Sequence, residues 1–141
     1  MKSPRNVRVY LQDIRHSIHQ IRAYTVDGKR VFLDDEKTQD AVIRNLAIIG
    51  EAVKKLPESV TKHYPKIAWK AVAGMRDILV HDYAETDMHT VWQTVQEDLP
   101  PLMEAMIFLL EEPSIFSENH IRHLRQSMKQ AKKGKTIRMK F

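Results

Sequence analysis

The sequence contains no cysteine, only four glycines, and no apolar run long enough to span a bilayer. The absence of cysteine excludes disulfide scaffolds, thiolate zinc sites and cysteine nucleophiles. A membrane-spanning helix needs about 18 or more consecutive apolar residues, and the polar first residues lack the apolar core of a signal peptide. We therefore expect a cytoplasmic protein without a membrane anchor.

The 141 residues suit a single domain, because compact domains commonly have about 100 to 150 residues. A hydrophobic fraction of 43% is sufficient for a core. The net charge of +5 is unevenly distributed: residues 113–141 carry eight Lys or Arg and one acid, whereas residues 1–112 carry a slight net negative charge. The sequence therefore predicts a folded domain over residues 1–112 and a basic C-terminal extension over residues 113–141.

The first apolar series runs from Val7 to Ile21 in alternating steps of four and three residues. This spacing keeps its five aliphatic side chains on one face of a helix. Ser3 is the expected N-cap, Pro4 the first helical residue, and Gly28 lies in the segment that ends the helix.

The second series, Val42 to Leu56, has the same spacing between candidate caps at Asp34 and Asp35 and a stop at Pro57. Ile48 and its apolar neighbours fall off the main stripe, so this helix is apolar almost all round. Such a helix is usually buried on two sides. The second side could be covered by another protomer.

Residues 57–66 are interpreted as a connection and residues 67–83 as a third helical segment. Asp87 is the expected cap of a last apolar series that continues to Leu109. The Pro100-Pro101 pair predicts either a kink or two abutting helices, because each proline removes a helical N–H and clashes with the preceding turn. No segment of residues 1–112 alternates apolar and polar residues with the period of two that is typical of a strand. We therefore predict an all-α, antiparallel four-helix bundle.

The extension after residue 112 allows three interpretations. It could be a partly disordered basic appendage, an arm that contacts RNA, or a strand that pairs with the edge of a partner's sheet. Ser117 is the candidate cap of a short helix within it.

The segment 74–83 contains the residues best suited to chemistry, namely Arg76, Asp77, His81 and Tyr83. An arginine can grip phosphate oxygens and a histidine can move a proton. Asp77 and His81 are four residues apart on one helix face, so Asp77 could orient the imidazole. Arg76 and His81 point about 140° apart on a straight helix. One protomer therefore does not bring them to the same phosphate unless the helix ends or bends.

Arg44 and Glu51 lie seven residues apart, opposite the main apolar stripe of the second helix. They could face a substrate-binding cleft and support it, form ion pairs across the interface of a dimer, or belong to an ordinary surface ion network. Trp69 and Trp92 are interpreted as core anchors rather than base-stacking platforms. Two histidine pairs have metal-ligand spacing, but no carboxylate or cysteine completes either, so we expect no metal and no cofactor. These pairs are His16 with His19 and His120 with His123.

The run 39–52, Trp69 and the run 74–83 together resemble the HepT-like toxins of the HEPN superfamily of helical ribonucleases. The resemblance covers roughly residues 5–112. Its signature is an arginine, four residues, a histidine, one residue and a tyrosine, which are Arg76, His81 and Tyr83 here. The extension 113–141 lies outside the resemblance.

The resemblance implies a HEPN-like bundle that acts as a metal-independent endoribonuclease toxin of a type VII-like toxin–antitoxin system. It implies a homodimer that cleaves cellular RNA, either tRNA or mRNA, with Arg76 and His81 of both protomers in one cleft. It also implies a minimal nucleotidyltransferase antitoxin that neutralises the toxin by adding AMP to Tyr83. A non-catalytic, nucleotide-binding or scaffolding partner of a nucleotidyltransferase is the main alternative, and an RNA chaperone acting through the basic extension is a third.

Overall fold

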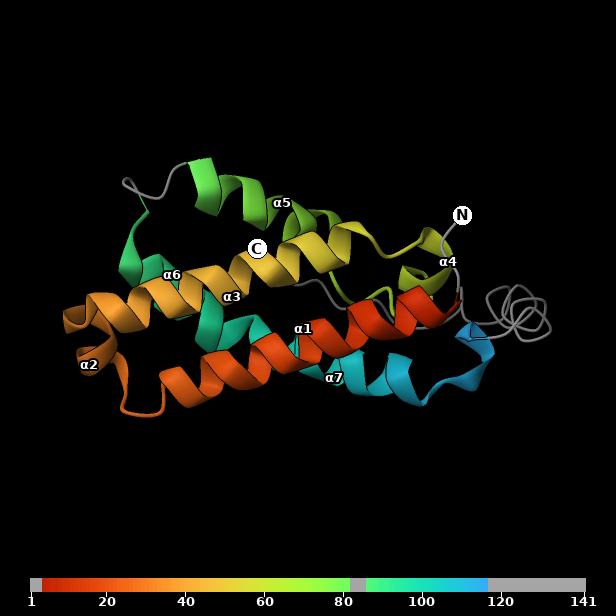
Figure 1. Cartoon of the computed structure of the whole chain (residues 1–141), viewed down its shortest axis with the longest axis horizontal. Helices are drawn as coiled ribbons and strands as arrows, with labels where there is room; N and C mark the ends of the chain where they lie inside the picture. Colours follow the sequence, from red (N-terminus) through yellow and green to blue (C-terminus); the bar gives the residue numbers. More distant parts are fainter. Residues whose placement is uncertain (1–3, 82–85, 117–141) are drawn as a thin grey trace.

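The computed structural model describes residues 4–81 and 86–116, and these residues form an all-α bundle without strands (Figure 1). Ser3, Tyr83 and Ser117 lie outside the described residues. The elements are α1 (Pro4–Tyr24), α2 (Lys29–Asp34), α3 (Glu36–Lys54), α4 (Glu58–Thr61), α5 (Trp69–His81), α6 (Met88–Glu97), α7 (Leu99–Glu111) and the short 3-10 helix η2 (Pro113–Ile115).

Helix α3 is the centre of the bundle and packs against α1 on one side and α5 on the other. The colours of Figure 1 show that α1, α3 and α5 run antiparallel to their neighbours. This position explains the nearly continuous apolar surface of α3, because two helices of the same chain cover it. Ile43 is 5% exposed in this packing, whereas Ile48 remains 38% exposed on the outer face.

Helix α1 buries the whole apolar series predicted for it, from Val7 to Ile21. It packs against α3 and α7, and the apolar side chains of these helices form one continuous core. The predicted first residue, Pro4, begins the helix. Gly28 adopts a φ of 95° in the turn that follows, a backbone conformation that favours glycine.

Two aspartates cap helices as the sequence predicts. The carboxylate of Asp35 accepts a hydrogen bond from the Lys37 backbone N–H at the start of α3, and Asp87 accepts one from His89 at the start of α6. Asp35 also accepts from the Thr38 hydroxyl at 2.6 Å, which lowers the pKa of the Asp35 carboxyl. Side-chain caps satisfy N–H groups that have no partner within the helix.

The two prolines at 100 and 101 separate α6 from α7, which confirms the alternative of two abutting helices. Helix α6 ends at Glu97, Asp98 lies between the helices, and α7 begins at Leu99. Both prolines therefore lie in the first turn of α7, where a missing N–H costs no intrahelical hydrogen bond.

Two short helices were not predicted. Helix α2 has six residues, too few to show a helical period, but it places Phe32 in the core at 1% exposure. The Phe32 ring lies 5.5 Å from that of Trp92, centroid to centroid. Helix α4 is a single turn within the predicted connection 57–66.

The first residues of the predicted extension pack against the bundle. Ile115 is 3% exposed, and the guanidinium of Arg8 lies 4.1 Å from the centroid of the Phe116 ring. The remainder of the extension, residues 117–141, is outside the described residues, so the predicted division at residue 113 stays a prediction. None of the described helices combines the length and the apolarity that crossing a membrane requires.

Candidate active site

Helix α5 carries the arginine of the predicted site on the flank that faces α3. Val72, Met75 and Leu79 recur at helical spacing and are buried in the core. Arg76 lies beside this stripe, so its backbone is held against α3 while its side chain remains partly exposed.

Gly50 allows α3 and α5 to approach each other at the level of Arg76. A Cβ atom at position 50 would lie 2.9 Å from the Arg76 backbone nitrogen, 3.0 Å from the Arg76 Cβ and 3.1 Å from the Val72 carbonyl oxygen. Real Cβ atoms essentially never approach backbone at the shortest of these distances. The absence of a side chain at position 50 therefore determines how closely the backbone of Arg76 packs against α3.

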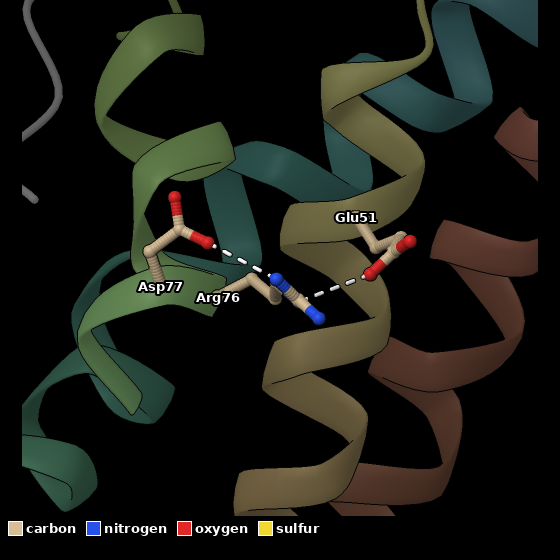
Figure 2. Close-up of polar contacts among 3 residues, drawn as sticks. All are labelled: Glu51, Arg76 and Asp77. Atoms are coloured by element: carbon tan, nitrogen blue, oxygen red, sulfur yellow. Dashed lines mark hydrogen bonds and ion pairs between the residues drawn. The ribbon is translucent and has the colours of Figure 1, made fainter. Parts of the chain in front are cut away.

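The guanidinium of Arg76 lies between two carboxylates (Figure 2). Its Nε forms an ion pair with Glu51 Oε2 of α3 at 3.1 Å, and its Nη1 donates a hydrogen bond to Asp77 Oδ1 of α5 at 3.2 Å. The Arg76 side chain is 39% exposed and both carboxylates are 51% exposed. Ion pairs this exposed contribute little stability. Their main effect is to restrict the orientation of the guanidinium.

Asp77 was predicted to orient His81, and the structure shows it paired with Arg76. Position 81 is helical, but the His81 side chain is outside the described part of the chain, so the predicted contact stays a prediction. Helical backbone from Arg76 to His81 places these residues about 140° apart and roughly 7.5 Å apart along the axis. The proposed acceptor Tyr83 lies in the segment 82–85 that the structure does not describe.

Arg44 and Glu51 both line a hollow of about 360 Å³ between α1 and α3, and Arg76 of α5 lines it as well. Tyr10 and Lys55 line the same hollow, with the Lys55 ammonium 5.6 Å from the centroid of the Tyr10 ring. Of the two residues predicted to support the cleft, Glu51 contacts Arg76 directly, whereas Arg44 shares the hollow with it.

Gly50 is the residue that the sequence interpretation missed as part of this site. Its signal was present, because a glycine in the interior of a helix costs roughly 0.5–1 kcal/mol relative to alanine and often marks close packing. Both tryptophans pack against the core as predicted, and each remains partly exposed, so their exclusion as base-stacking surfaces stays a prediction. Among the described residues no three His, Asp or Glu side chains are grouped as a metal site would require.

The sequence model of the family described as "Ribonuclease HepT-like" matches residues 14–108. "Probable ribonuclease HepT" of Thermococcus cleftensis is 44% identical over 99 residues, which are 70% of this chain and 90% of that protein. "Putative RNase" of Methanocaldococcus jannaschii is 37% identical over 118 residues, 83% of this chain and 98% of that protein.

Another protein of Methanocaldococcus jannaschii, named "Gamma-glutamylcyclotransferase and putative RNase", is 41% identical over 109 residues. These residues are 77% of this chain and 49% of that protein, so the chain spans about half the length of this relative. No solved structure matches the chain. The family model covers the helices that hold Gly50, Glu51 and Arg76, and the chain belongs to the HepT-like ribonuclease family.

Proposed function

We propose that this protein is an endoribonuclease that cleaves cellular RNA in the cytoplasm without a metal ion and acts as the toxin of a toxin–antitoxin pair. The observation that carries the proposal is the placement of Arg76. Gly50 fixes its backbone against α3, and two carboxylates restrict its guanidinium at a partly exposed position. The family membership supports the same class of reaction.

Arg76 is suited to stabilise a phosphate that gains charge during the reaction. A guanidinium has five N–H donors, and the ion pairs with Glu51 and Asp77 involve its Nε and Nη1 atoms. The remaining donors can bind non-bridging phosphate oxygens while Glu51 and Asp77 hold the group in place. Donors that are oriented before the reaction can stabilise the developing charge with little reorganisation.

His81 is the proposed proton-transfer group. As a base it would take the proton of a ribose 2′-hydroxyl, whose oxygen then attacks phosphorus and displaces the next nucleotide's 5′-oxygen. As an acid it would protonate that leaving oxygen. DNA lacks the 2′-hydroxyl, so we expect the enzyme to leave DNA intact.

A homodimer would bring the two groups to one substrate, because Arg76 and His81 point in different directions on one helix. If two α5 helices meet across a two-fold axis, Arg76 of one protomer can face His81 of its partner. Ile78, between these residues on α5, is 62% exposed in the single chain. A second protomer packed along α5 would cover this one exposed aliphatic side chain.

Tyr83 is the proposed acceptor of AMP from a nucleotidyltransferase antitoxin. Adenylation would form a bond between the tyrosine oxygen and the α-phosphorus of ATP and release pyrophosphate. The added phosphate would then compete with substrate phosphate near Arg76, by occupancy and by charge.

RNA cleavage in EDTA tests the proposal. Purified wild type, Arg76→Ala and His81→Ala are compared on total cellular RNA, with single-stranded DNA of matched sequence as the control. We expect wild type alone to cut RNA, with each substitution costing about 2 to 4 kcal/mol of barrier stabilisation. Intact RNA with protein that carries no AMP would instead favour the non-catalytic nucleotide-binding or scaffolding partner.

Mass spectrometry after coexpression with the cognate nucleotidyltransferase tests the regulatory part. We expect a mass gain of one adenylate on Tyr83 and loss of cleavage, both absent in Tyr83→Phe. An unmodified Tyr83 alongside an active nucleotidyltransferase would reject this mode of neutralisation.

A further inference from the structure

A groove of about 810 Å³ lies where the end of α3, the short helix α4 and the start of α5 meet. Val53 and Leu56 contribute apolar side chains from the α3 side, and Ala68, Trp69 and Ala73 contribute them from the α5 side. We call this hollow the Trp69 groove. Among the described residues, neither Arg76 nor Asp77 lines it.

Trp69 is held in a defined orientation within the groove. Its indole Nε1 donates a hydrogen bond to the Tyr64 carbonyl oxygen at 3.0 Å, and its ring packs partly against the core. The side chain is only partly buried and lines the groove. A fixed and partly exposed aromatic ring is the surface on which unpaired bases stack in proteins that bind single strands.

Lysines surround this apolar floor. Lys54, Lys62 and Lys70 line the groove with one acid, Glu58. Glu58 pairs with Lys62 at 3.3 Å, whereas Lys54 and Lys70 are in no ion pair within the described part of the chain. The groove therefore carries a net positive charge above an apolar and aromatic surface. Phosphates and bases complement these two features.

The Trp69 groove and Arg76 lie along the same helix–helix junction. Trp69 and Arg76 are seven residues apart on α5, which places them on nearly the same helix face and roughly 10 Å apart along the axis. Ala73 lines the groove between them, and on α3 Lys54 follows Glu51 by one turn. A strand bound with a phosphate at Arg76 could therefore continue along the junction into the groove.

We propose that the Trp69 groove binds an unpaired nucleotide of the RNA next to the cleaved phosphate. Its base stacks on Trp69, and Lys54 and Lys70 contact the flanking phosphates. This inference rests on the proposed ribonuclease function and adds a binding site that favours single-stranded RNA. The lysines disfavour the basic extension of this chain as the occupant, because the charges would repel.

RNA binding by the full-length chain tests the site without requiring cleavage. The proteins carry His81→Ala to keep the RNA intact and Trp92→Phe so that Trp69 is the only tryptophan. A short single-stranded RNA of mixed sequence is titrated while tryptophan fluorescence is recorded. We expect quenching of Trp69, and about tenfold weaker binding in the double variant Lys54→Ala/Lys70→Ala, with a shallower dependence on salt.

The matched control is Lys29→Ala/Lys37→Ala, which removes two exposed lysines near the other end of α3. We expect this control to bind RNA like its parent. Trp69→Leu keeps an apolar side chain but removes the aromatic face. We expect it to weaken binding, measured by the fluorescence anisotropy of dye-labelled RNA because this variant has no tryptophan left, while circular dichroism verifies folding. In the active enzyme, the Lys54/Lys70 double variant should raise KM more than it lowers kcat.

The outcomes separate this inference from the proposed function. If wild type cuts RNA but RNA neither quenches Trp69 nor depends on Lys54 and Lys70, the groove is not an RNA site. If RNA binds with unchanged affinity while the lysine variant loses the purified antitoxin, the groove binds protein and the inference is wrong. If lysine-dependent quenching occurs but wild type cuts no RNA, the binding site stands and the nuclease proposal fails.

Discussion

Gly50 of α3 lies directly against the backbone of Arg76 in α5, so close that a Cβ atom at Gly50 would be 2.9 Å from the Arg76 nitrogen. The following residue, Glu51, binds the Arg76 guanidinium. Two consecutive positions of α3 thus control the same arginine, one through its backbone and one through its side chain. Catalysis that depends on Arg76 should therefore respond to small changes in α3.

Substitution of Gly50 by alanine should move α5 and lower RNA cleavage. The methyl group meets backbone atoms that cannot turn aside, and overpacking of this kind costs about 1–3 kcal/mol of folding stability. A shift of about 1 Å at the reacting groups can cost as much as a hundredfold in rate. Thermal unfolding and initial cleavage rates of Gly50→Ala measure both effects.

Gly74→Ala is the matched control, because it adds the same methyl group to a helix of the same site. A Cβ atom at Gly74 meets nothing within 4 Å. We expect it to stabilise α5 by roughly 0.5–1 kcal/mol and to leave cleavage nearly unchanged. Equal activity losses in the two variants would show that the contact between Gly50 and Arg76 has no special role.

Glu51→Gln should lower kcat without weakening RNA binding. The substitution removes the charged partner of Arg76 Nε, so the guanidinium becomes less well oriented. It also removes a negative charge, which favours the approach of RNA. Because the pair is exposed, folding stability should change by less than about 1 kcal/mol. Steady-state kinetics measure whether kcat falls while KM stays unchanged. Glu97→Gln on α6 serves as the control. An unchanged kcat in Glu51→Gln would contradict the orienting role.

Asp77→Asn distinguishes two roles for this carboxylate. The structure pairs Asp77 with Arg76, whereas its position four residues before His81 also suits a contact with the imidazole. If Asp77 orients His81, the acidic limb of the pH–rate profile should move to lower pH, because the imidazolium loses a stabilising charge. A lower rate with an unmoved profile would assign Asp77 to Arg76 alone.

His63 should make the fold less stable in mild acid. Its Nε2 atom is buried without a hydrogen-bond partner among the described residues. Burial lowers the pKa of His63 below its ordinary 6.5, and the charge of Glu112 opposes this shift. The unfolded chain therefore binds the proton first as the pH falls below 6.5, so the free energy of unfolding decreases from that pH downward.

Chemical denaturation at a series of pH values tests the role of His63. In His63→Gln this part of the pH dependence should disappear, while His19→Gln, which changes an exposed histidine on α1, should retain it. Identical pH profiles for wild type and His63→Gln would show that other groups cause the acid sensitivity.

Local patterns predicted most of the fold, because a helix with one buried face repeats its apolar residues every three or four positions in the sequence. The spacing from Val7 to Ile21 defined α1, and Pro100-Pro101 separated two helices as one of two alternatives. Helix α2 was not predicted, because six residues are too few to show the repeat of apolar residues that marks a helix, although Phe32 is a core residue.

The site was less predictable because its contacts join residues far apart in the chain. The sequence indicated Arg76, and it indicated Glu51 as one of several surface possibilities, but not that the two bind each other. The apolar surface of α3 allowed either a second protomer or a second helix as its cover, and only the three-dimensional packing places α5 there. Because α5 covers this side of α3, the proposed dimer needs an interface elsewhere on the protein.

The end of the folded body can be located by two truncations. Ile115 is 3% exposed and Phe116 packs beneath Arg8, so the residues just after the predicted division at residue 113 contact the bundle. A chain ending at Phe116 should unfold at nearly the temperature of the full-length protein, whereas one ending at Glu112 should lose about 2–5 kcal/mol through the loss of Ile115. If the shorter chain were equally stable, this packing would add nothing to the fold. RNA affinity of the chain ending at Phe116 then tests the basic extension. A weaker affinity with a shallower salt dependence makes it an RNA-contacting arm, whereas an unchanged affinity for both RNA and a protein partner makes it an appendage.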